Sequence, residues 1–172
     1  MYKSQLIVSM LHSRDEWEPL INHVGLPRVG IGGVSGLLSV KDIVAHIMAR
    51  EQHLADRLAV LARGERPRAC STQPELDAFT EEFGYPDFDS PLLSTEAADE
   101  WIFQKYRNAP MNEIVADELH AFDSLLTAVR SIPEERLNEL GLMPKILDVT
   151  VEHYRAHGAD IRKRFKRPLR QF

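Results

Sequence analysis

Two histidines near the end of the chain, His153 and His157, have the spacing of a metal-ligand pair. They are four residues apart, so on a helix they lie on one face, about one turn from each other. An apolar stripe in steps of three and four runs through both positions and consists of Ile146, Val149, His153, His157, Ile161 and Phe165. The stripe predicts that both imidazoles point into the core, where each needs a partner. The pair therefore indicates either a divalent metal site or two histidines hydrogen-bonded to their neighbours.

A third ligand would have to come from another helix. His46 is the best candidate, because it lies midway along a helix predicted over residues 39–62, at the edge of its apolar stripe. His53 follows seven residues later on the same side. Glu51 falls inside the stripe, where an acid is unexpected, and it could be a further ligand, a general base or the partner of Arg50. With a fourth position left to water, such a site would be catalytic in type.

The elements that must position these residues are all predicted to be helices. Apolar residues recur with a period near 3.6, and no segment alternates as a strand would. The predicted helices run from about Ser4 to Val24, from either Ser39 or Lys41-Asp42 to about residue 62, from Ser94 to about residue 108, from Pro110 to about 132, and over about 145–165. Residues 25–36 hold five glycines and one proline and must form a loop, and residues 65–94 form a long connection with one helical turn near 75–83. The sequence therefore predicts an all-α domain of four main helices with long crossovers.

Size and charge limit the possible partners. The 172 residues, 44% hydrophobic and 27% charged, suit one globular domain spanning 1–172. No run of 18 apolar residues and no signal-peptide core is present, which predicts a cytoplasmic protein without a membrane partner. Residues 1–160 carry 15 basic and 26 acidic side chains, a charge of −11 that would repel nucleic acid. The basic tail, 162–172, complements the dipole of a last helix.

Cys70 is the one cysteine, so a disulfide framework and a four-thiolate zinc site are excluded. It lies in a loop rich in Pro, Ser and Thr, with Arg66 and Arg68 nearby. Cations beside a thiol favour the thiolate, so Cys70 is either a reactive thiol or an incidental surface one.

Three segments resemble the DinB-like superfamily. Residues 39–46 (SVKDIVAH) resemble its second-helix motif, and residues 150–157 (TVEHYRAH), followed by Ile161, resemble its last-helix motif. Residues 98–110 (ADEWIFQKYRNAP) resemble the ClbS/DfsB branch, and the resemblance spans roughly residues 5–165. The chain departs from the common pattern at Leu38, where the superfamily often has Trp.

The resemblance implies a four-helix bundle of DinB-like type with long crossover connections, often a homodimer. It also implies a metal site made by His46, His153 and His157. Zinc or nickel would suit three imidazoles best, and iron or manganese are also accepted. Members with this full ligand set resemble metal-dependent thiol S-transferases in small-molecule detoxification, which join a thiol such as bacillithiol, mycothiol or glutathione to an electrophile. In such an enzyme Glu51 would accept a proton or orient a ligand.

Two other functions stay open at this stage. A metal-free small-molecule binding or resistance protein, as in the ClbS/DfsB branch, would need a pocket. Its lining could include aromatic side chains, or these could be ordinary core packing: Trp101, Phe103, Tyr106, Tyr154 and the aromatics of residues 79–88. The third possibility is a metal-stabilised scaffold whose dimer is the functional unit.

Overall fold

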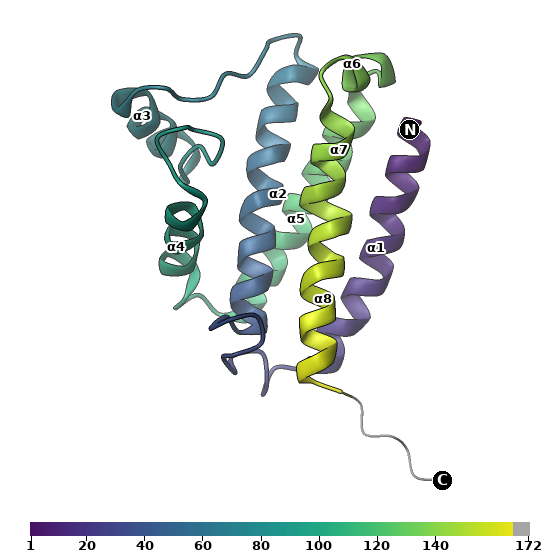
Figure 1. The fold of residues 1–172 in the computed structure, drawn as a ribbon, viewed down its shortest axis with the longest axis vertical. Helices are drawn as coiled ribbons and strands as arrows, with labels where there is room; N and C mark the ends of the chain where they lie inside the picture. Colours follow the sequence, from purple (N-terminus) through teal and green to yellow (C-terminus); the bar gives the residue numbers. More distant parts are fainter. Residues whose placement is uncertain (167–172) are drawn as a thin grey trace. The chain divides into compact units, whose positions relative to one another are not determined.

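The computed structural model describes residues 1–166, and its regular elements there are helices (Figure 1). Among these residues the only β pairing is an isolated bridge between Ser35 and Leu38, so the predicted all-α class is confirmed. The elements are α1 (Lys3–Val24), α2 (Val40–Ala62), α3 (Gln73–Phe83), α4 (Thr95–Tyr106), α5 (Met111–Ser131), α6 (Glu134–Glu139), α7 (Leu142–Leu147), the π-helical turn η1 (Asp148–Glu152) and α8 (His153–Arg164). Arg167 and Arg170, predicted as part of the basic tail, lie outside the described residues.

Side-chain caps explain where several helices begin. At α2, the Ser39 N–H donates to Asp42 Oδ2 at 2.9 Å, and the Asp42 N–H donates back to Ser39 Oγ at 3.2 Å. This reciprocal pair satisfies two backbone donors that a helix start leaves without partners. Ser94 caps α4 in a similar way, because its Oγ accepts from the Ala97 N–H at 3.1 Å. Of the two predicted starts of α2, the one at Ser39 is therefore confirmed, as is the start of α4 at Ser94.

Other predicted details are wrong. Residues 73–83 form the complete helix α3 instead of one turn, capped by the Thr72 side chain and ended by Gly84 in the left-handed region. The first helix begins after Tyr2 and not at Ser4, and Pro110 precedes α5 instead of opening it.

The chain divides into two compact units, and α2 is shared between them at Ile47. The first unit contains residues 1–47 and those from Glu134 on. Within it, α1 contacts α7, η1 and α8, and Figure 1 shows α1 (purple) beside α8 (yellow). Its fully buried side chains include Leu6, Met10, Ile43, Ile146 and Ile161. That the whole chain is one domain stays a prediction.

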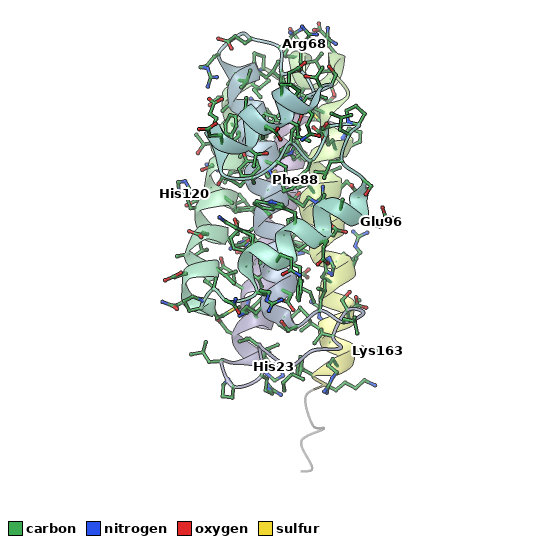
Figure 2. All side chains as sticks on the ribbon, turned by 90° about the vertical axis from the view of Figure 1, so that its left-hand side faces the viewer. His23, Arg68, Phe88, Glu96, His120 and Lys163 are labelled. Carbon is green, nitrogen blue, oxygen red and sulfur yellow. The ribbon has the colours of Figure 1, made fainter. Side chains whose placement is uncertain are left out.

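The second unit, Met48–Pro133, contains the rest of α2, the segment carrying α3 and α4, and α5. Its aromatic core cluster has five buried members, Ala49, Tyr85, Phe88, Ala98 and Ile102. Phe79, Phe83, Trp101 and Tyr106 pack against this cluster from its edges. The long connection after α2 is therefore a packed part of the unit. Phe88, labelled in Figure 2, belongs to the part of this connection that joins α3 to α4.

Within residues 1–166, no helix combines the length and the apolar character needed to cross a membrane.

Candidate metal centre

The last helix brings His153 and His157 together. Their ring centroids are 5.3 Å apart, and both side chains are half-buried. The buried face of this helix differs from the predicted stripe by about one residue over part of its length. Thr150, Tyr154 and Gly158 are buried, whereas the predicted Val149, His153 and His157 are half-buried. The imidazoles therefore flank the buried face instead of occupying its centre.

A π-helical turn explains part of this difference. The turn η1 ends directly before His153, and the Thr150 hydroxyl within it donates to the Ile146 carbonyl at 2.7 Å. A π turn takes more residues than an α turn, so it shifts the register of the residues that follow. Such turns occur frequently at functional sites. An analysis of sequence periodicity assumes an unbroken repeat of 3.6 residues, so it does not detect this shift of the buried face.

The third imidazole comes from α2, in the same unit. His46 Nε2 lies 3.3 Å from His153 Nε2, and the His46 ring centroid lies 4.9 Å from that of His153 and 5.7 Å from that of His157. One potential ligand nitrogen from each ring can be chosen so that all three lie within 4.8 Å of one another. The predicted trio, His46, His153 and His157, is therefore brought together in space.

This arrangement fits the ligand set of a divalent metal ion. Two nitrogens bound tetrahedrally to zinc at about 2.0–2.1 Å are about 3.3–3.4 Å apart, which matches the 3.3 Å between His46 and His153. The same distance also allows an N–H···N hydrogen bond between the two rings. The three rings are half-buried, and imidazole donors suit zinc, nickel and iron.

Glu51, predicted as a catalytic residue, is fully buried on α2 and belongs to the second unit. Its suggested partner, Arg50, binds Asp99 instead, with 2.9 Å between Arg50 Nη2 and Asp99 Oδ1. The Arg50 guanidinium also lies 4.9 Å from the centroid of the Phe88 ring. A catalytic role for Glu51 stays a prediction.

His53, the alternative metal ligand, belongs to a different cluster in the second unit. Its Nε2 lies 2.9 Å from Oδ1 of the fully buried Asp87, and Asp89 is the third potential ligand of this group. Arg57 contacts both carboxylates, Asp87 at 3.5 Å and Asp89 at 3.2 Å. Because a cation already lies against these acids, the cluster is better described as a buried ion-pair network than as a metal site.

Asp87 is the centre of that network. Its Oδ2 accepts from the Cys70 N–H at 2.8 Å, and its Oδ1 accepts from the Asp89 N–H at 3.0 Å. Burial opposes ionisation, but the hydrogen bonds from His53, Cys70 and Asp89 and the charge of Arg57 hold the pKa of Asp87 well below its usual value. Sequence reasoning missed this residue, although an acid within the aromatic run YPDF is an available signal.

Cys70 is neither a surface thiol nor an activated one. It is buried, and its Sγ lies 3.6 Å from the Glu75 carbonyl oxygen. Burial raises the pKa of the Cys70 thiol, and the neighbouring Asp87 carboxylate raises it further. The expected effect of Arg66 and Arg68 on the thiolate is therefore not found.

Most aromatic side chains proposed for a binding pocket are packed against other residues. Trp101 and Tyr106 lie against the aromatic core cluster of the second unit. Tyr154, in the first unit, is buried with its ring centroid 5.2 Å from that of Trp17, and the Arg14 Nη1–H donates to its hydroxyl at 3.3 Å. These contacts are those of core packing, although Tyr154 also lines a hollow of the first unit.

In comparisons with known proteins, the chain matches no family model, no curated protein and no solved structure.

Proposed function

We propose that the chain is a DinB-like four-helix bundle whose His46, His153 and His157 hold a divalent metal ion, zinc or nickel before iron or manganese. The observation that supports this proposal is the convergence of three imidazoles from two helices, with 3.3 Å between His46 Nε2 and His153 Nε2. Histidines four residues apart place two donors on one helix face, and the third comes from a separate helix. Three protein ligands with an open side are typical of catalytic metal sites.

We further propose a metal-dependent thiol S-transferase that joins a small thiol to an electrophile in detoxification. A metal ion bound here would supply Lewis acidity, lowering the pKa of a bound thiol. The chain's own contribution is to hold the three imidazoles at fixed spacing and, in this proposal, to accept the thiol proton at Glu51. The enzyme would act as a homodimer, as the DinB-like resemblance implies.

Metal content tests the first part of the proposal. Full-length protein, purified without chelator and then offered zinc, nickel or manganese, is assayed by elemental analysis beside His46→Ala, His153→Ala and His157→Ala. His12→Ala is the matched control, because its side chain is 73% exposed and pairs only locally with Glu16. We expect about one ion per chain in the wild type and control. Each ligand variant should lose more than the 10–100-fold in affinity that loss of an outer-shell partner costs.

Two results would overturn this assignment. A wild-type protein that holds no metal after loading is not a metalloprotein, and the metal-free binding function of the ClbS/DfsB branch then replaces the enzyme. A His46→Ala variant that keeps its metal shows that His46 is not a ligand. If metal binding holds, Glu51→Gln should lower thiol transfer to an electrophile while leaving metal content unchanged.

A further inference from the structure

A groove between α1 and α8, within the first unit, consists of two adjoining hollows of about 320 Å³ each. The first hollow is the more polar of the two, and its lining includes Ser9, Ser13, Trp17, Tyr154 and Arg155. The second is more apolar, with Leu20 and Phe165 in its wall. Glu16 and Arg162 line both hollows. The two hollows therefore form one continuous groove with a polar and an apolar end.

Gly158 makes room for the Arg162 guanidinium in this groove. A Cβ atom at Gly158 would lie 3.2 Å from Arg162 Nη1 and 3.6 Å from Leu20 Cδ2. The arginine side chain therefore folds back along α8 over the glycine, towards α1. Glycine inside a helix makes the helix less stable than alanine would. At the buried Gly158 this loss of stability accompanies the room that the missing side chain leaves. That space places a positive charge where the two hollows meet.

The charge of Arg162 is not matched by a carboxylate within residues 1–166. Of the other groups that line the polar hollow, Arg155 pairs with Glu152 at 3.0 Å, and the Glu16 carboxylate lies 3.5 Å from the His12 ring, which is a charged partner only when it is protonated. At the apolar end, Lys166 adds a second cation, and the buried Nε2 of His23 has no hydrogen-bond partner within the same residues. A polar atom buried without a protein partner takes its hydrogen bond from water or from a bound group. The groove thus offers positive charge and unused hydrogen-bonding capacity beside an apolar wall.

We propose that this groove binds a small amphiphilic carboxylate. Its carboxylate would pair with the Arg162 guanidinium, whose planar donors match carboxylate geometry, and its aliphatic arm would lie against Leu20 and Phe165. The volume suits such a ligand, since each hollow is at the small end of the about 300–1,000 Å³ range of ligand pockets. Arg162 projects about 140° around the helix from His157, so this groove is separate from the histidine cluster.

Three probes separate the charge from the apolar arm. Octanoate carries both, octan-1-ol has only the arm, and acetate has only the charge. Binding to the full-length protein is measured by isothermal titration calorimetry in the presence of EDTA, so that a metal at the histidines cannot bind the carboxylate. We expect octanoate to bind at least tenfold more tightly than either of the other probes. The result is independent of whether the histidine cluster binds a metal.

Arg162→Gln and Lys163→Gln form the matched pair of variants. Both remove one positive charge from the last turn of α8, and Lys163 is exposed near the end of the helix in Figure 2. Loss of a charge-assisted hydrogen bond should weaken octanoate binding at least tenfold in Arg162→Gln, and Lys163→Gln should stay within twofold of the wild type. Gly158→Ala should also weaken binding, because the new methyl group displaces the guanidinium while the helix is retained.

The proposal is overturned by any of three results. The first is that octanoate does not bind at millimolar concentration, and the second is that it binds no better than octan-1-ol. The third is that Arg162→Gln binds octanoate as tightly as Lys163→Gln does. Far-ultraviolet circular dichroism establishes that each variant is folded, so weaker binding cannot be attributed to unfolding.

Discussion

Replacing Asp87 by asparagine tests how far one buried carboxylate stabilises the second unit. Asp87 accepts hydrogen bonds from the His53 ring, the Cys70 N–H and the Asp89 N–H, at 2.9, 2.8 and 3.0 Å. It thereby links the end of the connection after α2 to α2 itself. Asparagine keeps the shape of the side chain but removes the charge and turns one acceptor atom into a donor.

The size of the effect follows from these contacts. Donors face both carboxylate oxygens of Asp87, so the new amide NH₂ meets a donor in either orientation. One buried donor left without its acceptor costs about 1–3 kcal/mol. Losing the negative charge beside His53 and Arg57 brings the total towards the about 3–5 kcal/mol that is typical of a broken buried ion pair. We therefore expect Asp87→Asn to lower the free energy of unfolding by about 3–5 kcal/mol.

Urea unfolding followed by circular dichroism measures this change. With a slope near 2 kcal/mol per molar urea, the midpoint should fall by about 1.5–2.5 M. Asp89→Asn is the control, because it removes the same charge two residues away from a side chain that is 30% exposed and leaves the backbone donor to Asp87 intact. It should cost no more than about 1 kcal/mol.

The dependence on pH provides a second readout. The pKa of Asp87 in the folded protein is below its ordinary value of 3.8, so at low pH the unfolded chain binds a proton before the folded chain does. The stabilisation from Asp87 is therefore complete above about pH 5 and is lost as the pH falls through 3.8 towards the folded pKa. Asp87→Asn should lose less stability than the wild type between pH 5 and 3. Equal urea midpoints for Asp87→Asn and Asp89→Asn, or unchanged pH dependence, would refute the reasoning.

Two further predictions concern single groups. Cys70 should react with iodoacetamide at pH 8 at least tenfold more slowly in the folded protein than in urea, because burial raises the pKa of its thiol and limits access. Mass spectrometry measures both rates, and equal rates would contradict the buried position. Ser39→Ala should lower the free energy of unfolding by about 1 kcal/mol through loss of the reciprocal cap with Asp42. Ser4 is exposed in the first turn of α1, so Ser4→Ala should change the free energy of unfolding by less than half as much. The urea midpoints of the two variants measure both changes, and equal midpoints would contradict the role of the cap.

The helices and several of their ends follow from local sequence. Ser39 and Ser94 mark helix starts because a cap is formed by residues three positions apart, so its hydrogen bonds depend on no distant part of the chain. The shared side of His153 and His157 is equally local, since the helical repeat alone places residues four apart on one face. The glycine-rich residues 25–36 form the predicted loop for the same kind of reason, the backbone freedom of glycine.

What distant segments do was decided only by tertiary structure. His46 and His53 share a helix and a side, yet His46 meets His153 while His53 meets Asp87. No periodicity distinguishes them, because the difference lies in which residues pack against each part of α2. The π turn before His153 likewise shifts the buried face of the last helix. A π turn takes in one residue more than an α turn, and the sequence pattern does not show where such a turn forms. A sequence determines local faces and ends, but which faces meet depends on the packing of the whole chain.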